Sequence, residues 1–272
     1  MNATILLHTA ARRYCLERYN FWCNRYSEIV RQSGDRESGG YHYTAEALAT
    51  FPRYNVLKAI RIDLERLTPD KLGDFESAKA LLILAGLTAG DDFTRPTADQ
   101  VEYPVSIEER EAFCRYISGL SLSDLRAVEA LPFRRVLTAD ESKNLRSLMY
   151  HRWQIVDGYW YPLAECGLSD IVAFKEYAFS GTATQPLLQS ILAGRGIARV
   201  WELREYGPEY EQDISLFEPH YNGAEGYWSS GNLDWIVYTS HESSVTVGGW
   251  LLGEIKAIWS SWQDHIWTGP YS

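Results

Sequence analysis

Apolar residues in the first part of the chain recur at the spacing of an α-helix. Between residues 4 and 31, every seventh position falls on one side of a helix: His8, Cys15, Trp22 and Ile29. Tyr19 and Tyr26 lie between them on the same side. A seven-residue period of this kind is typical of a helix with one buried stripe. The pattern therefore predicts a single long helix at the start of the chain.

A second helix is indicated from Thr44, a suitable N-cap residue with Glu46 in the first turn. Pro52 is expected to interrupt it, because proline lacks the backbone N–H that a helix interior uses. Beyond this proline the apolar positions return to helical spacing: Val56, Ile60, Leu64 and Leu67. A third helix is expected over residues 75–85, ended by Gly86.

Helix start signals continue through the middle of the chain. Ser121-x-x-Asp124 and Thr138-x-x-Glu141 have the pattern of capping boxes, so two or three helices are expected over residues 106–153. Two further helices are predicted, over residues 169–177 and from Thr184 to Gly194.

The last third of the chain contains short strands separated by turns. Residues 200–217 indicate two strands around Gly207-Pro208, and residues 234–249 indicate a hairpin with a polar break at His241-Glu242. Both faces of the first hairpin strand are apolar, which is typical of a strand inside a sheet. A helix is expected from about Trp250. The predicted fold class is α+β, with a helical N-terminal region followed by an antiparallel β-sheet covered by a C-terminal helix.

The distribution of charge divides the chain in two. Up to Ile155 there are 21 Lys+Arg and 21 Asp+Glu, whereas from Val156 onward there are 5 and 15. All but one of the ten tryptophans lie from Trp153 onward. We therefore predict a helical domain over residues 1–155 and an acidic, tryptophan-rich α+β domain over residues 156–272.

Composition also limits the class of protein. Nucleic-acid binding is not expected, because phosphate neutralisation requires clustered Lys and Arg. No window approaches 18 uninterrupted apolar residues, so membrane insertion is not expected, and four cysteines without C-x-x-C spacing are typical of a cytoplasmic protein. The oligomeric state does not follow from the sequence.

Candidate catalytic residues concentrate between residues 218 and 242. They are carboxylates and imidazoles that can support acid–base chemistry if the fold brings them together: Glu218, His220, Glu225, Asp234, His241 and Glu242. The alternative is that the loop before residue 226 and the break at 241–244 are ordinary polar turns, and the turn chemistry favours this alternative.

Metal and cofactor sites are not expected. Val245 stands where the second histidine of an H-E-x-x-H motif must be, and the six histidines form no i,i+3 or i,i+4 pair. Neither a G-x-G-x-x-G fingerprint nor a Walker lysine is present, and no G-x-S-x-G elbow supplies a nucleophile.

Aromatic residues provide candidate binding positions. Tyrosine and tryptophan anchor both protein and sugar interfaces. The residues we single out for this role are Tyr159, Trp160, Tyr161, Tyr221, Tyr227 and Trp228.

Two functions remain as hypotheses from different classes. The favoured one is a protein-binding module whose acidic C-terminal domain docks a basic protein partner, because a negative field steers cationic partners. In composition alone this character is similar to that of bacterial immunity proteins, which are acidic, cytoplasmic and without catalytic motifs. The alternative is a hydrolase that acts on a glycoside or an amide through the carboxylates and histidines of residues 218–242.

Overall fold

The computed structural model describes residues 3–32, 44–90, 93–94, 102–179 and 184–269. Contacts divide the chain into two compact units, Met1–Leu131 and Pro132–Ser272. We call them the helical unit and the sheet unit and describe each by itself.

In the helical unit, the described residues form the α-helices α1 (Ala3–Gln32), α2 (Ala45–Arg66), α3 (Phe75–Thr88) and α4 (Pro104–Gly119), with short 3₁₀ turns at Pro69–Lys71 and Asp124–Ala127. Their apolar stripes meet in one core, which contains Leu7 and Cys15 of α1 together with Val56 and Ile60 of α2. The predicted long first helix and the Thr44 cap are confirmed, the cap by a bond from the Ala47 N–H to the Thr44 hydroxyl.

Two predictions in this unit are wrong, the interruption at Pro52 and the helix end at Gly86. Pro52 lies inside α2 and does not interrupt it, because Val56, Ile60 and Leu64 bury the turns that follow and outweigh one missing hydrogen bond. Gly86 does not end α3, which runs on to Thr88. Its role is close packing, since a Cβ there would lie 2.5 Å from the Phe113 ring of α4.

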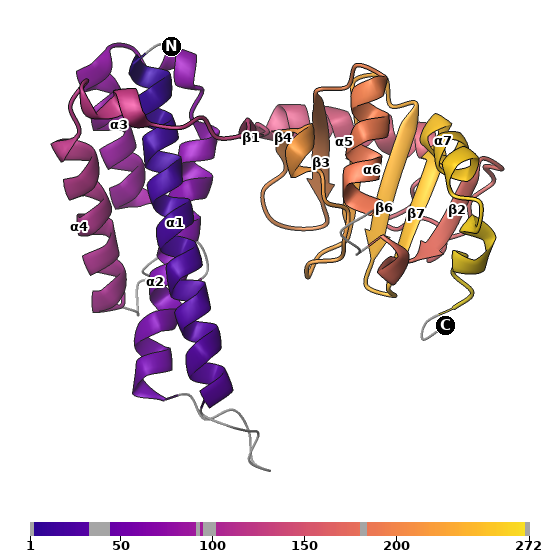
Figure 1. Cartoon of the computed structure of the whole chain (residues 1–272), viewed down its shortest axis with the longest axis horizontal. Coiled ribbons are helices and arrows are strands. Elements are labelled where there is room, and N and C mark those ends of the chain that lie inside the picture. The colour runs from indigo at the N-terminus through magenta and orange to yellow at the C-terminus, as the bar shows by residue number, and fades with distance from the viewer. Residues whose placement is uncertain (1–2, 33–43, 91–92, 95–101, 180–183, 270–272) are drawn as a thin grey trace. The chain divides into compact units, whose positions relative to one another are not determined.

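The sheet unit is built on a seven-stranded antiparallel sheet in the order β1-β4-β3-β5-β6-β7-β2 (Figure 1). The strands are β1 (Arg134–Val136), β2 (Ile171–Lys175), β3 (Arg199–Arg204), β4 (Tyr210–Asp213), β5 (Gly226–Ser229), β6 (Trp235–Ser240) and β7 (Ser244–Gly249). The helices are α5 (Ala139–Trp153), α6 (Thr184–Gly194) and α7 (Trp250–Ile258), with 3₁₀ turns at Glu176–Ala178, Ile214–Leu216 and Trp262–His265. The predicted α+β class, with an antiparallel sheet and a C-terminal helix over it, is confirmed.

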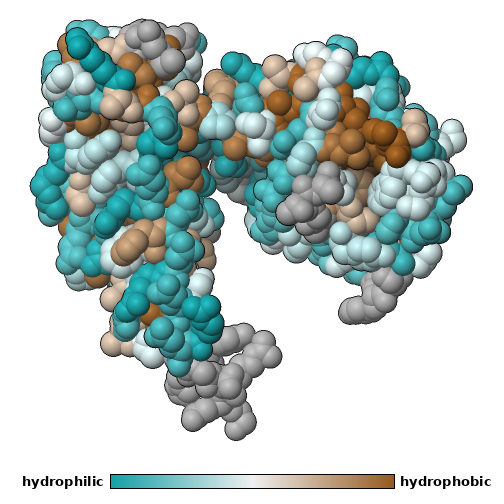
Figure 2. Space-filling view, viewed as in Figure 1, coloured by the Kyte–Doolittle hydropathy of each residue, from teal (hydrophilic) through white to brown (hydrophobic). Residues whose placement is uncertain are grey.

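Helices cover both faces of this sheet. On one face, α6 and α7 pack on Trp235, Val237 and their neighbours, and on the other α5 packs on Ile236 and Tyr238. In Figure 1, α6 lies in front of the sheet and α5 behind it. In the view of Figure 2, hydrophobic residues gather over α6 and α7, and the rest of the visible surface of the sheet unit is mostly hydrophilic. Strand β6 is central, as its two apolar faces predicted.

The unit boundary differs from the expected one at residue 155. The helix α5, capped by the predicted Thr138–Glu141 capping box, packs through Met149 and Trp153 on the sheet and therefore belongs to the second unit. With the boundary after Leu131, the helical unit has 16 Lys+Arg and 19 Asp+Glu, and the sheet unit 10 and 17. Most of the acidic excess still belongs to the sheet unit.

The helix predicted over residues 169–177 is a strand. Residues Ile171–Lys175 form β2, which pairs with β7 along its whole length, from Ile171 opposite Gly248 to Lys175 opposite Ser244. The segment is too short for its periodicity to distinguish a helix from a strand. It becomes a strand because its backbone pairs with the edge of β7 that β6 leaves open.

Candidate functional site

The strands bring four acidic residues together at one end of the sheet. This end is formed where β3 ends, β5 begins, β6 turns into β7, and β2 ends. We call it the acidic end and define it by Glu176, Glu205, Tyr206, Tyr221, Glu225, His241 and Glu242. Backbone bonds join its segments, from the Glu205 N–H to the Glu225 carbonyl (2.9 Å) and from the Glu176 N–H to the Ser243 carbonyl (2.9 Å).

At the centre of the acidic end, a buried carboxylate holds a histidine. The Glu225 side chain is 1% exposed and the His241 side chain 49% exposed. Glu225 Oε1 accepts from the backbone N–H of His241 (3.1 Å) and lies 2.5 Å from its ring Nδ1. The hydrogen bond to Glu225 raises the pKa of His241 above its ordinary value. His241 therefore keeps its positive charge to a higher pH than a free histidine does.

Further carboxylates surround the same imidazole. Glu242 Oε1 lies 3.5 Å from His241 Nε2, and Glu205 Oε2 lies 3.5 Å from the backbone nitrogen of Glu225. The charges of Glu242 and Glu205 add to the effect of Glu225 in raising the pKa of His241. Two carboxylates thus contact the imidazole, and a third lies close enough for its charge to act on it, so the group remains negative even when His241 is protonated.

Two buried tyrosines lie near Glu225. The rings of Tyr227 and Tyr238 stack at 4.7 Å between centroids, and both side chains are buried. Burial raises the pKa of Tyr238, and the neighbouring Tyr227 and the Glu225 carboxylate raise it further. Both phenols therefore stay protonated beside the buried Glu225 side chain.

Two aromatic side chains stand beside this group at the surface. Tyr206 is 59% exposed, and its hydroxyl donates to the Gly223 carbonyl. The Tyr221 ring lies 6.5 Å from the His241 ring, and its backbone N–H donates to Glu176 Oε1 (2.7 Å). The acidic end thus presents carboxylates, an imidazole and two phenols together.

Cations are few here. Lys175 ends β2, and Arg204 ends β3. The Arg204 guanidinium is held by Asn222 Oδ1 (2.5 Å) and Glu202 Oε1 (3.4 Å), so part of its charge is already compensated. The local charge of the acidic end is negative.

This arrangement can hold and transfer a proton but lacks a nucleophile. A carboxylate that orients a histidine supplies two members of a catalytic triad, and the third member is a nucleophile. The nearby Ser240 and Ser244 hydroxyls are buried and bond to each other (2.7 Å). Within the described chain, neither a hydroxyl nor a thiol is bonded to His241.

The structure separates the six candidate catalytic residues. Glu225, His241 and Glu242 meet at the acidic end, as described above. Asp234 precedes β6, whereas His241 follows it, so about 20 Å of strand lies between them. Glu218 is exposed, and its described contact is a bond between its backbone carbonyl and His220 Nδ1 (3.1 Å), which joins neither residue to Glu225.

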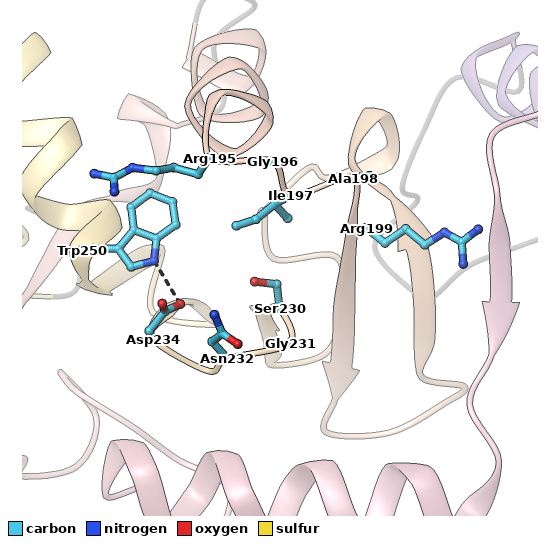
Figure 3. Close-up of a pocket in the computed structure, with 10 residues that line it drawn as sticks. All are labelled: Arg195, Gly196, Ile197, Ala198, Arg199, Ser230, Gly231, Asn232, Asp234 and Trp250. Atoms are coloured by element: carbon cyan, nitrogen blue, oxygen red, sulfur yellow. Dashed lines mark hydrogen bonds between the residues drawn. The ribbon is translucent and has the colours of Figure 1, made fainter.

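Asp234 belongs to the opposite end of the sheet. There its Oδ1 accepts from Trp250 Nε1 (3.0 Å), and it lines a pocket with Ser230 and Asn232 (Figure 3). The segments at this end are the α6–β3 link, the β5–β6 turn and the start of α7. We call it the pocket end.

The six aromatic binding candidates also divide into two groups. Tyr159, Tyr161 and Tyr221 reach the surface. The other three are buried and cannot serve as contact residues in this conformation: Trp160, Tyr227 and Trp228. Trp160 is fixed by a bond from its Nε1 to the Trp153 carbonyl (2.6 Å), which satisfies its one polar atom inside the core.

Glu176, Glu205 and Tyr206 are residues of the acidic end that the sequence reasoning missed. Glu205 and Tyr206 lie in the predicted Gly207-Pro208 turn, but their importance depends on which strand lies beside β3. Arg204 is opposite Gly226 in the sheet, so the end of β3 meets the start of β5. That β3 and β5 are neighbours follows only from the strand order of the folded sheet.

Comparison of the chain with models of protein families, with curated proteins and with solved structures gave no match in any of the three. Among the described residues, no helix has the length and apolar character needed to cross a membrane. In the same part of the chain, no group of three or more His, Cys, Asp or Glu residues is arranged to hold a metal ion.

Proposed function

We propose that the protein is a binding module whose sheet unit docks a basic protein partner through the acidic end. The observation that carries this proposal is the grouping of carboxylates around one imidazole beside surface tyrosines. Glu225 and Glu242 contact the His241 ring, and Glu205 lies against the backbone of Glu225. A regulatory or immunity-type factor that neutralises a cationic domain is the kind of protein this surface suits.

Electrostatics supports docking in two ways. A surface of one sign raises the rate at which a partner of the opposite sign arrives. Elsewhere in the sheet unit, several acids are already neutralised by arginine, since Arg135 pairs with Glu141 and Glu211 and Arg146 pairs with Glu209. Acids without a described ion pair also lie away from the acidic end, for example Asp157, Asp170 and Asp213. What distinguishes the acidic end is that several carboxylates lie close together there.

The tyrosines supply the contact itself. Tyrosine is enriched at interface hot spots because it buries a large area and carries a hydroxyl. Tyr206 and Tyr221 stand at the surface next to the carboxylates, so a lysine or arginine side chain can reach a carboxylate and an aromatic face together.

The hydrolase alternative has one supporting contact, the Glu225–His241 pair. A glycosidase needs two carboxylates that both reach the scissile bond. Glu225 is buried and already bonded to His241, and Asp234 lies at the other end of β6. We therefore favour docking over hydrolysis.

The test compares charge reversals at the two ends of the sheet. The full chain and the variants Glu205→Lys, Glu242→Lys and Asp170→Lys are titrated with a labelled decalysine peptide at low and high salt. Asp170 is the matched control, because it is exposed and precedes β2 at the pocket end. We expect the first two variants to weaken binding at least about tenfold at low salt and to flatten its salt dependence.

A second arm uses the same four proteins as baits in a cell extract. The proposal expects a basic protein to be retained by the unaltered chain and by Asp170→Lys, and to be lost from Glu205→Lys and Glu242→Lys. The proposal is overturned if all three variants weaken peptide binding equally. It is also overturned if Glu205→Lys and Glu242→Lys still retain the protein that the unaltered chain captures.

A further inference from the structure

A pocket of about 560 Å³ lies at the pocket end of the sheet (Figure 3). This volume is within the range of small-molecule sites. Three segments line it: residues Arg195 to Arg199, which join α6 to β3, the β5–β6 turn from Ser230 to Asp234, and Trp250 at the start of α7. The acidic end contributes nothing to it, so its role is independent of the proposed docking function.

The charged groups at its rim are engaged elsewhere. In Figure 3 the guanidinium groups of Arg195 and Arg199 extend to opposite outer sides of the pocket. Arg195 lies over the Trp250 ring at 5.0 Å and pairs with Glu254. Arg199 lies over the Phe133 ring at 3.7 Å and pairs with a glutamate of β4. The pocket therefore does not present an arginine cluster to an anion.

Side chains that line the pocket offer both hydrogen-bond donors and acceptors. Trp250 Nε1 donates to Asp234 Oδ1, which orients both the indole and the carboxylate and leaves Oδ2 as an acceptor. Trp235 Nε1 donates to Ser230 Oγ (2.7 Å), so the serine proton remains to be donated. The Asn232 amide is exposed in the same turn and offers both a donor and an acceptor.

The opposite wall is apolar. Trp250 and Ile197 lie across the pocket from Ser230 and Asn232 in Figure 3. An aromatic ring carries negative charge on its face, and it attracts weakly positive C–H groups. The pocket thus combines polar side chains with two apolar ones, Ile197 and the Trp250 indole, whose ring also contacts Arg195.

We propose that this pocket binds a vicinal diol, the paired hydroxyls of a pyranoside or of a ribose. The Asp234 carboxylate accepts from one hydroxyl, and the Asn232 amide and the Ser230 hydroxyl meet the second. Trp250 and Ile197 contact the carbon skeleton. Hydrogen bonds to an ionised acceptor are the strong ones in such a set, so Asp234 is the residue that determines affinity.

The experiment follows tryptophan fluorescence and ligand-observed NMR of the full chain with six compounds. The diols are methyl α-glucopyranoside, methyl α-mannopyranoside, methyl β-galactopyranoside and adenosine. The matched compounds, each lacking one hydroxyl and therefore any vicinal diol, are methyl 3-deoxy-α-glucopyranoside and 2′-deoxyadenosine. We expect a diol to bind and its deoxy partner to bind at least about tenfold more weakly.

The variant Asp234→Asn tests the residue. Its amide oxygen can still accept from Trp250 Nε1, but an NH2 group, which only donates, replaces the second carboxylate oxygen. Binding of the diol should therefore fall at least about tenfold. Asp170→Asn, an exposed acid near the pocket that does not line it, should bind as the unaltered chain does. Thermal unfolding of both variants checks that the fold is kept.

The two sources of the diol give different results. Binding of pyranosides alone assigns a saccharide, and binding of adenosine alone assigns a ribonucleoside. The proposal is overturned if none of the four diols binds, if the deoxy compounds bind equally well, or if folded Asp234→Asn keeps full affinity.

Discussion

The two ends of the seven-stranded sheet are connected by the same strands but carry different chemistry. The acidic end is made of charged turns around Glu225 and His241, and its centre is held by charge-assisted hydrogen bonds. The pocket end is held by indole N–H donors and by close backbone packing at Gly249. The first surface suits a macromolecular partner, and the second suits a small ligand.

The comparison shows how an antiparallel sheet sorts residues. Asp234 lies between Glu225 and His241 in the sequence, yet it belongs to the other end. Each strand has one terminus at each end, so the segments between strands alternate from end to end along much of this sheet. Proximity in sequence therefore does not bring these residues into one site.

The largest effect is expected from Gly249→Ala at the pocket end. Gly249 has φ +72°, and a Cβ there would lie 2.2 Å from the Asp234 carbonyl oxygen. Because neither the backbone conformation nor the space admits alanine, the free energy of unfolding should fall by about 3 kcal/mol or more. Gly253→Ala in α7 is the control, since nothing lies within 4 Å of its Cβ and alanine favours a helix. Urea unfolding that shows similar stability for the two variants contradicts this view of the pocket end.

A smaller loss is expected from Glu225→Ala at the acidic end. The change removes a buried carboxylate and leaves the His241 backbone N–H without its acceptor, which should lower the free energy of unfolding by about 2 kcal/mol. Glu205→Ala, at an exposed position on the same end, should change it by less than about 0.5 kcal/mol. If urea unfolding gives equal losses, Glu225 is not the anchor of this end.

The pH dependence of His241 sharpens the comparison further. The hydrogen bond to Glu225 raises the pKa of His241 in the folded protein above its value of about 6.5 in the unfolded chain. The contribution of His241 to stability is therefore complete below about pH 6.5 and is lost as the pH rises through the folded-state pKa. Because the ring is half exposed, this contribution should stay below about 1 kcal/mol. An NMR titration should show the raised pKa, and Glu225→Gln should return it toward 6.5.

His8 in the helical unit supplies an internal reference for that titration. Burial lowers its pKa to about 4, so it stays neutral where His241 is charged. Its effect on stability has the opposite sign and is lost as pH falls from about 6.5 toward 4. A His241 signal that titrates at the ordinary value in the unaltered protein would contradict the Glu225 contact.

The smallest effect is expected for the ion pair at the pocket end. Arg195 and Glu254 are largely exposed, with side chains 56% and 36% accessible, so a double-mutant cycle should give a coupling below about 0.5 kcal/mol. The same cycle on Glu225 and His241 should give a larger coupling, because one partner is buried. Equal couplings would mean that burial of Glu225 does not strengthen its bond.

Local patterns predicted many of the elements correctly. The Thr44 and Thr138 caps, the Gly207-Pro208 turn and the central hairpin strand all follow from interactions within a few residues. The 169–177 segment failed as a helix because its five strand residues are fixed by β7, which follows much later in the chain. The observed unit boundary differs from the one expected at residue 155 for the same reason, because α5 packs on strands that come much later in the sequence.

For the candidate site, the sequence supplied the residue types but not their grouping. Glu225 and His241 were among the predicted residues and do meet, whereas Asp234, Glu218 and His220 were predicted with them and do not join them. Burial removed Trp160, Tyr227 and Trp228 from the surface, because their positions point into the two layers on either side of the sheet.

By itself, the sequence determined the α+β class, the acidic excess of the second half and the stock of carboxylates, imidazoles and indoles, since these depend on composition and short-range periodicity. The tertiary structure alone decided the strand order, and with it the separation of the acidic end from the pocket end. The physical reason is that strand pairing and burial depend on contacts between distant segments, and no local pattern in the chain encodes which distant segments will meet.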